Sequence, residues 1–135
     1  MDFIDLKKQQ KLIRRNIDDR ISKVLNHGQY ILGPEVKELE NNLSLFSKSK
    51  YVLCCSSGTD ALLLGLISLG LKPNDGVIVP SFTFASTAET VCMLGGVPFF
   101  SDVNIDTFNI CEDSILNSIT EAKKQGVTLK GIISV

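Results

Sequence analysis

The sequence of 135 residues is poor in the side chains that build metal sites and disulfide frameworks. It contains one histidine, His27, and four cysteines, none of them in a CxxC pair. Adjacent Cys54 and Cys55 would point to opposite faces of a strand, which is poor geometry for a shared metal ion. We therefore expect no metal site. We expect all four cysteines to be reduced and to act as packing residues. They are Cys54, Cys55, Cys92 and Cys111.

The chain also lacks an excess of charge and a long apolar run. Its formal net charge is -1, which gives no electrostatic reason to expect nucleic acid or an anionic membrane as a partner. The longest strongly apolar stretch, Ala61 to Leu71, is too short to span a bilayer. The mixed charges that follow Met1 and Asp2 are not typical of a signal peptide. The expected location is therefore the cytoplasm.

Two common nucleotide-binding motifs are missing as well. No GxGxxG occurs, and the turn Ser57-Gly58-Thr59-Asp60 has no lysine that would make it a GxxxxGK[ST] phosphate loop. This turn does lie between a predicted apolar strand and an apolar helix, where free backbone N–H groups and the helix dipole favour an anion. From the motif alone, an ordinary N-cap at Ser57, with Asp60 adding charge to the first turn, is an equally good interpretation.

Strand and helix patterns alternate from residue 51 onward. Strands are expected near 51–55, 77–80, 97–102 and 130–135, and helices near 59–69, 84–94 and 112–125. This alternation predicts an α/β fold with a mainly parallel sheet. Ligands of such sheets bind at the carboxyl ends of the strands. The residues Ser56-Ser57-Gly58 and the segment from Ser81 to Phe84 would both lie there.

Two helices are expected before the sheet. The first has apolar residues at helical spacing from Ile13 to Leu25 and ends at His27-Gly28. The second begins at Pro34, and Val36, Leu39, Leu43 and Phe46 predict one buried face for it. Tyr30 lies in the turn between the two helices, where it is equally well interpreted as a ligand contact or as a packed loop aromatic.

Two features near the end of the chain are less informative about chemistry. Asp102 and Asp106 could be paired carboxylates, but a turn built on side-chain hydrogen bonds is the favoured interpretation. The last predicted strand is the end of the chain, so we expect a truncated protein. An open sheet edge and uncovered apolar faces then predict poor solubility for this chain alone.

The order of the motifs is more specific than any one of them. They are Phe3-Ile4-Asp5-Leu6-Lys7, His27-Gly28-Gln29-Tyr30-Ile31-Leu32-Gly33-Pro34-Glu35-Val36, Ser57-Gly58-Thr59-Asp60-Ala61-Leu62, Pro80-Ser81-Phe82-Thr83-Phe84, Gly96-Val97-Pro98 and Asp102-Val103. This succession resembles the DegT/DnrJ/EryC1/StrS family of pyridoxal-phosphate-dependent nucleotide-sugar aminotransferases, from Phe3 to Val135. Since family members are much longer, residues 1–135 would be an N-terminal segment and part of the large cofactor-binding domain. The rest of that domain and the small C-terminal domain would be missing.

The resemblance implies fold type I, the aspartate-aminotransferase architecture, and a homodimer. The family's reaction transfers an amino group, usually from glutamate, to a nucleotide-linked keto-sugar, with pyridoxal 5'-phosphate as the cofactor. The product would be an amino sugar for surface polysaccharide such as lipopolysaccharide. The segments FIDLKKQQ and HGQYILGPEVKELE are most similar to members that act on UDP-linked 3-keto-N-acetyl uronic acids.

The resemblance also assigns roles by position. The residues that match the turn holding the cofactor phosphate are Ser57, Gly58, Thr59 and Asp60. Phe84 matches the aromatic that stacks on the pyridine ring, although a plain core aromatic is the alternative for it. Tyr30 and Glu89 match segments near the sugar pocket.

No catalytic residue is expected within the chain. The lysine that binds the cofactor covalently belongs to a segment downstream of Val135 in this family. The last part of the chain does contain lysines, but none of them stands at the matching position. They are Lys123, Lys124 and Lys130. The chain alone is therefore expected to be inactive.

Two other functions remain open at this point. One is a sugar dehydratase of the same fold and cofactor, in which a histidine replaces the downstream lysine. The other is a non-catalytic gene remnant or binding module. The residue at the downstream lysine position would separate the first from an aminotransferase.

Overall fold

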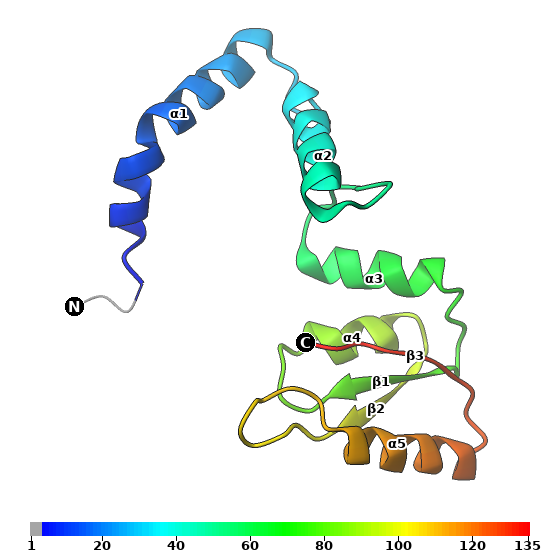
Figure 1. Cartoon of the computed structure of the whole chain (residues 1–135). Helices are drawn as coiled ribbons and strands as arrows, with labels where there is room; N and C mark the ends of the chain where they lie inside the picture. The colour runs from blue at the N-terminus through cyan, green and yellow to red at the C-terminus, as the bar shows by residue number, and fades with distance from the viewer. Residues whose placement is uncertain (1–3) are drawn as a thin grey trace. The chain divides into compact units, whose positions relative to one another are not determined.

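The computed structural model describes residues 4–135 and divides into two compact units, one up to Cys54 and one from Cys55 to Val135. Phe3, the first residue of the opening motif, lies outside the described residues. The first unit holds helices α1 (Leu6–His27) and α2 (Pro34–Ser47), and the second holds a sheet with its helices (Figure 1). Among the described residues, no helix combines the length and the hydropathy that a membrane span requires.

In the first unit, local signals set the ends of the helices. The Asp5 carboxylate accepts a hydrogen bond from the Lys8 amide (2.9 Å) and so begins α1. Gly28, with a left-handed φ of 68°, ends α1, which confirms the predicted stop. A Cβ at Gly33 would lie 2.4 Å from the carbonyl oxygen of Gln29, so only glycine fits before Pro34 and the start of α2.

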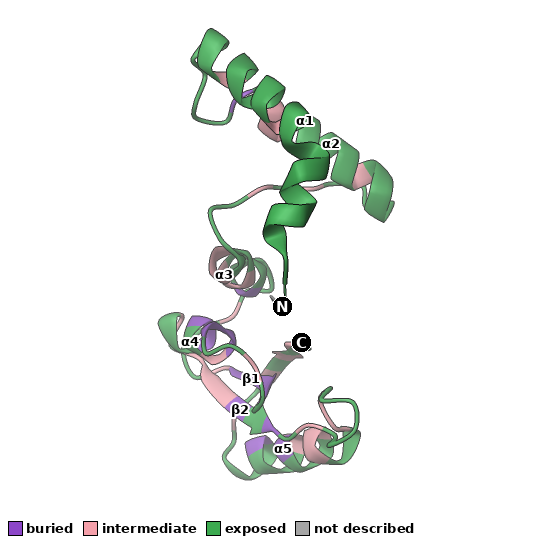
Figure 2. Ribbon diagram, turned by 90° about the vertical axis from the view of Figure 1, so that its left-hand side faces the viewer, coloured by how far each residue is buried: buried purple, intermediate pink, exposed green. Residues whose placement is uncertain are grey.

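The predicted buried face of α2 is wrong for the chain as it stands. Neither α1 nor α2 contains a buried residue, and the Phe46 side chain is 88% exposed. In Figure 2 both helices are almost entirely in the colour of exposed residues. An apolar helix face becomes buried only when another element packs on it. Within the described residues of this unit, the two helices cover each other only in part, at positions such as Ile17, Val24 and Val36.

The second unit is built on a parallel sheet of three strands. The strands are β1 (Gly76–Pro80), β2 (Val97–Ser101) and β3 (Leu129–Ile132), in the order β2-β1-β3. Helices α3 (Gly58–Ser68), α4 (Ser86–Met93) and α5 (Glu112–Lys124) alternate with them along the chain. The predicted α/β class, its parallel sheet and these helices are therefore confirmed.

Strand β1 has the central position and is buried along its whole length. Its side chains alternate between the two faces of the sheet, as strand geometry requires. Val77 and Val79 pack with residues of α3 and α4, whereas Ile78 packs with Phe99 and with Ala122 of α5. Helices α3 and α4 thus cover one face and α5 covers the other (Figure 1).

The predicted first strand, 51–55, is not a strand in this structure. Tyr51 and Leu53 are exposed, and the Cys54 amide donates to the Glu40 side chain (2.8 Å) rather than to a neighbouring strand. A strand requires a partner for its backbone hydrogen bonds. The described part of the chain supplies none for this segment, so its β-rich composition does not produce a ladder.

Candidate functional site

The parallel sheet brings the two predicted cofactor segments to one edge. The N-termini of α3 and α4 lie on the side to which β1 and β2 point, and the loop 102–111 lies there too (Figure 1). The Ser57 turn precedes α3, and the segment from Ser81 to Phe84 joins β1 to α4. The segment after β1 therefore lies at the carboxyl edge, as predicted. The Ser57 turn lies on the same side (Figure 1), although the strand 51–55 that was expected to precede it does not form.

Ser57 and Asp60 together form the start of α3. The Ser57 hydroxyl accepts a hydrogen bond from the Asp60 amide (3.1 Å), and the Ser57 carbonyl accepts one from Ala61 (3.0 Å). The Asp60 carboxylate in turn accepts from the hydroxyl of Ser56, a residue that the sequence analysis did not assign. The sequence signal that could have indicated this role of Ser56 is the pair of serines directly before Gly58. The capping interpretation of Ser57 and Asp60 is therefore confirmed.

Capping leaves several donors of the same turn without a partner, and three of them belong to Gly58 and Thr59. The amides of Gly58 and Thr59 and the Thr59 hydroxyl make no hydrogen bond within residues 4–135. A Cβ at Gly58 would meet nothing within 4 Å, so packing inside the chain does not require a glycine there. Close approach of a group from outside would require it. Three free donors at a helix N-terminus, with open space above them, fit an anion such as a phosphate.

The aromatic segment after β1 is held at both ends. The Ser81 amide donates to the carbonyl oxygen of Ser101 (2.8 Å), and the Ser81 hydroxyl donates to the Asp102 carboxylate (3.3 Å). At the other end, the Phe84 carbonyl accepts from the Thr87 amide (3.1 Å). The Phe84 ring itself is 77% exposed, so the interpretation as a core aromatic does not apply within this chain. Glu89, in the first turn of α4, is exposed as well.

The loop 102–111 is a hydrogen-bonded turn, as the sequence favoured. Asn104 provides the side-chain acceptor, which receives bonds from the amides of Asp106 (2.9 Å) and Thr107 (3.2 Å). Asp102 accepts from its neighbour Val103 (2.8 Å) and from Ser81. The turn interpretation is therefore confirmed, with Asn104 and Asp102 as its side-chain acceptors.

Tyr30 belongs to the first unit and lines a cavity of about 380 Å³ there. The cavity is apolar along Ile21 and Leu25, and Glu35 lies at it as the acidic group. The backbone amide of Glu35 and the His27 ring (3.1 Å) donate to the Glu35 carboxylate and lower its pKa from the usual 4.5. Tyr30 is exposed, so the interpretation as a packed loop aromatic does not hold within this chain.

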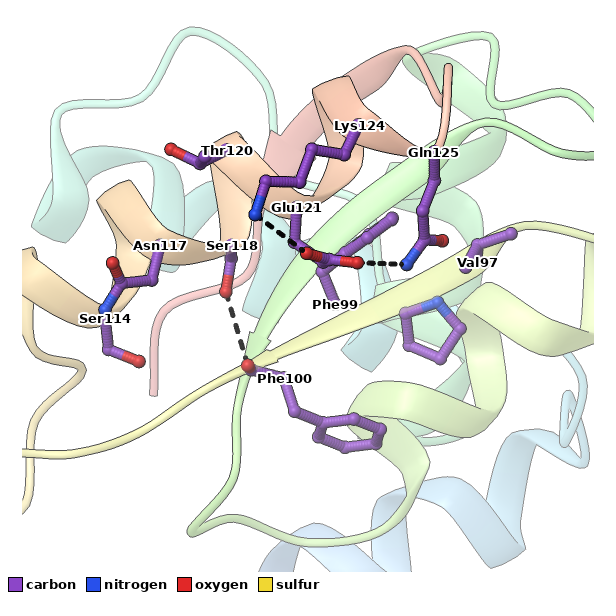
Figure 3. Close-up of a pocket in the computed structure, with 11 residues that line it drawn as sticks. Val97, Phe99, Phe100, Ser114, Asn117, Ser118, Thr120, Glu121, Lys124 and Gln125 are labelled. Atoms are coloured by element: carbon purple, nitrogen blue, oxygen red, sulfur yellow. Dashed lines mark hydrogen bonds and ion pairs between the residues drawn. The ribbon is translucent and has the colours of Figure 1, made fainter.

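A second cavity, of about 520 Å³, contains none of the predicted site residues (Figure 3). It lies between the edge strand β2 and helix α5, and three of its polar side chains bond to one another. Gln125 donates to Glu121 (2.9 Å), and the Lys124 ammonium lies 3.8 Å from the same carboxylate. These pairs account for the charged groups of the cavity, whereas the Asn117 side chain, which also lines it, makes no hydrogen bond within residues 4–135.

The thiols are free, but only half of them pack as expected. Cys54 and Cys111 are partly buried, whereas Cys55 and Cys92 are exposed, so the packing prediction is wrong for the second pair. In residues 4–135 no cluster of metal-ligating side chains is found.

Comparison with known proteins identifies relatives of this arrangement. The profile of the DegT/DnrJ/EryC1/StrS aminotransferase family matches residues 11–135. A UDP-2-acetamido-2-deoxy-3-oxo-D-glucuronate aminotransferase from Pseudomonas aeruginosa is 48% identical over 124 residues, which are 92% of this chain and 34% of that protein.

Solved structures agree with the sequence comparison. A DegT DnrJ EryC1 StrS aminotransferase from Brucella abortus superposes with a TM-score of 0.95 at 42% identity, over 99% of this chain and 36% of that one. NtdA from Bacillus subtilis, solved with its cofactor PMP bound, gives a TM-score of 0.74 at 31% identity, over 85% and 32% of the two chains. The chain thus spans about a third of the length of these relatives.

Proposed function

The chain belongs to the DegT/DnrJ/EryC1/StrS aminotransferase family, and we propose that it is the N-terminal part of an enzyme that aminates a nucleotide-linked keto-sugar with glutamate as the amino donor. Residues 1–135 would provide the N-terminal helices and part of the large cofactor-binding domain. The observation that carries the proposal is the set of three free donors at Gly58 and Thr59, at the same sheet edge as the exposed Phe84 ring.

The family's cofactor is pyridoxal phosphate, which supplies an electron sink for amino-group transfer when it is bound. The residues of this chain fit its phosphate. The amides of Gly58 and Thr59 and the Thr59 hydroxyl would donate to the phosphate oxygens. Ser57 and Asp60 would act indirectly, since their mutual hydrogen bond holds the turn in place.

Phe84 would contact the flat ring of the cofactor. Its exposed aromatic face can stack on the ring, fix the ring plane and exclude water from that side. The covalent lysine and the carboxylate at the ring nitrogen are expected from segments beyond this chain. The part played by residues 1–135 is therefore to bind and orient the cofactor.

The substrate proposal rests on the Pseudomonas aeruginosa relative. Its name specifies a UDP-linked 3-oxo-glucuronate, and we infer a UDP-linked 3-keto-N-acetyl uronic acid for this enzyme. Tyr30 and Glu89 are the residues proposed to reach the sugar. We further propose that the complete enzyme is a cytoplasmic homodimer. Its product would be an amino sugar for surface polysaccharide.

The phosphate site can be tested in the complete enzyme that carries this segment. Thr59→Ala removes one of the three donors, and cofactor affinity measured by absorbance titration should fall about tenfold. Thr120→Ala, on the exposed side of α5, is the matched control and should leave the affinity unchanged. Equal affinity of the Thr59→Ala variant and the parent enzyme would refute the phosphate assignment.

The substrate class needs its own assay. The complete enzyme with glutamate should convert a UDP-linked 3-keto uronic acid and release 2-oxoglutarate. Residues 1–135 alone should show no turnover and no cofactor adduct that borohydride can fix at a specific lysine. Turnover by the 135-residue chain alone would overturn this division of the site.

A further inference from the structure

We propose that Phe108 is a positioning residue for Phe84: its ring supports Phe82, and so holds the segment that presents Phe84 to the cofactor ring. The inference rests on the proposed function, because that function gives the Phe84 ring its role. It concerns the loop 102–111, to which the sequence analysis assigned no part in the site.

The contacts of the aromatic segment point to this loop. The rings of Phe82 and Phe108 have their centroids 5.6 Å apart at an interplanar angle of 39°. The Ser81 hydroxyl donates to Asp102 (3.3 Å), which is the first residue of the loop. Within residues 4–135, these are the side-chain hydrogen bonds and ring pairs that join positions 81–84 to a segment other than α4.

The segment receives little support from the core. Phe82 and Phe84 are 65% and 77% exposed, and Phe108 is 55% exposed. Their mutual arrangement therefore depends on direct contacts at the sheet edge rather than on burial. An aromatic pair at this separation stabilises the geometry of both rings beyond the area that it buries.

The loop holds Phe108 in a fixed orientation. The Phe108 amide donates to the Asn104 carbonyl (2.8 Å), and the Asn104 amide donates to the carbonyl of Asn109 (2.9 Å). An isolated antiparallel bridge between Val103 and Ile110 closes the loop at its base. The ring of Phe108 thus projects from a closed, hydrogen-bonded turn.

The backbone of Phe108 is strained in this turn. Its φ of 57° is in the left-handed region, which is unfavourable for a bulky residue and easier for asparagine or glycine. The turn alone would be better served by one of those residues. A phenylalanine at this strained position is explained if its ring makes a contact that asparagine or glycine cannot make. The contact with the Phe82 ring is such a contact.

Substitution of Phe108 by asparagine separates this role from folding. In the complete enzyme, Phe108→Asn removes the ring but suits the left-handed backbone. The dissociation constant of the cofactor should rise about threefold to tenfold. The thermal midpoint of the cofactor-free enzyme should stay unchanged or rise, because the strain is relieved. A merely structural role of the ring predicts the opposite, a lower midpoint at an unchanged dissociation constant.

Three further variants complete the test. Phe108→Tyr keeps the ring and should keep the parent affinity. Lys48→Asn relieves a similar left-handed backbone (φ 56°) at the end of α2 and should not change cofactor binding. If Phe108→Asn does not fold, Phe82→Leu tests the same ring pair from the other side and should give the same loss.

The outcomes that overturn the inference differ from those that overturn the function. Parent affinity in the Phe108→Asn variant, or in Phe82→Leu where that variant replaces it, would overturn the positioning role. An equal loss in Phe108→Tyr would do so as well. Failure of the parent enzyme itself to bind the cofactor would instead overturn the proposed function.

Discussion

At Gly96 the chain passes from α4 to β2 through a space that excludes a side chain. A Cβ there would lie 2.9 Å from the Val91 side chain and 3.1 Å from the carbonyl oxygens of Asp75 and Val91. The carbonyl oxygens belong to backbone that is fixed, since Val97 donates to Asp75 (2.8 Å) and Gly96 donates to Val91 (2.9 Å). Gly65, inside α3, is the opposite case, because nothing lies within 4 Å of its added Cβ.

We predict that Gly96→Ala lowers the free energy of unfolding by about 1–3 kcal/mol, since the added methyl group overpacks a contact with fixed backbone. Gly65→Ala is the matched control and should be neutral or raise stability by up to about 1 kcal/mol, because alanine favours the helix. Urea unfolding of dilute protein, followed by circular dichroism, measures both. Equal stability of the two variants would show that the contact at Gly96 is relaxed at little cost.

At the scale of elements, hydrogen bonds of serine side chains connect β2 to α5. The hydroxyls of Ser101 and Ser118 are 2.7 Å apart and both residues are buried. The Ser118 hydroxyl also donates to the Phe100 carbonyl (3.3 Å; Figure 3). This carbonyl points away from β1, since that of the next residue, Ser101, accepts from Ser81 at the end of β1. Pro98, the other residue with its backbone directed away from β1, has no N–H to donate. The free edge of β2 is thereby protected from pairing with another strand.

Replacement of Ser118 by alanine should lower the free energy of unfolding by about 1 kcal/mol, because a buried hydrogen bond is lost. It should also leave the Phe100 carbonyl without its partner and increase association of the chain through β2. Thr120→Ala, on the exposed side of the same helix, should change stability by less than about 0.5 kcal/mol. Denaturant unfolding and light scattering test the two effects, and an equal response of both variants would contradict the role of Ser118.

Helices α1 and α2 are linked by charged groups rather than by a core. The two terminal guanidinium nitrogens of Arg20, Nη1 and Nη2, donate to the Glu38 carboxylate (3.1 and 2.9 Å), and these hydrogen bonds lower the pKa of Glu38 from the usual 4.5. A lowered pKa in the folded chain means that the ionised carboxylate stabilises the structure above pH 4.5. This contribution is lost as the pH falls below 4.5 through the folded-state pKa.

We expect Arg20→Met to return the pKa of Glu38 toward 4.5, since the first cause of the shift is removed. Carboxyl ¹³C chemical shifts of Glu38 recorded between pH 2.5 and 7 measure this pKa directly. Arg14→Met breaks the Arg14–Asp18 pair (2.8 Å) within α1 and is the control that should leave Glu38 unaffected. An unshifted Glu38 in the Arg20→Met variant would rule out the arginine as the cause.

At the scale of the whole molecule, the chain leaves large apolar side chains uncovered in both units. Ile31 and Phe46 are nearly 90% exposed in the first unit, and Ile105 and Phe84 nearly 80% in the second. A small apolar cavity of about 220 Å³ between α3 and β3 is also open. Exposed apolar area of this extent indicates that other protein segments or a partner chain pack on these surfaces.

The 135-residue chain alone is therefore expected to self-associate and to bind a hydrophobic dye such as ANS. The complete enzyme should do neither beyond a defined oligomer, because those side chains are then covered. Sedimentation velocity and dye fluorescence at matched concentrations distinguish the two. A monodisperse 135-residue monomer without dye binding would contradict the expectation.

The helices and the three strands of the sheet were predictable because their signals are local or periodic. Gly28 and Pro34 end and begin helices through their own backbone preferences. The apolar run of β1 indicates a strand buried on both faces. Segment 51–55 was predicted wrongly for a related reason, since its composition suits a strand but pairing depends on a neighbour that these residues do not contain.

For the turn before α3, the sequence by itself determined that a helix begins after Ser57 and that its N-terminus lies at the carboxyl edge of a parallel sheet. It could not separate a cap from an anion site, because both use the same residue types. The tertiary structure showed that the Ser57 hydroxyl caps the Asp60 amide while Gly58 and Thr59 keep free donors. Only the folded chain also brings Phe108 to Phe82, since a contact between residues far apart in sequence depends on how the loops meet at the sheet edge.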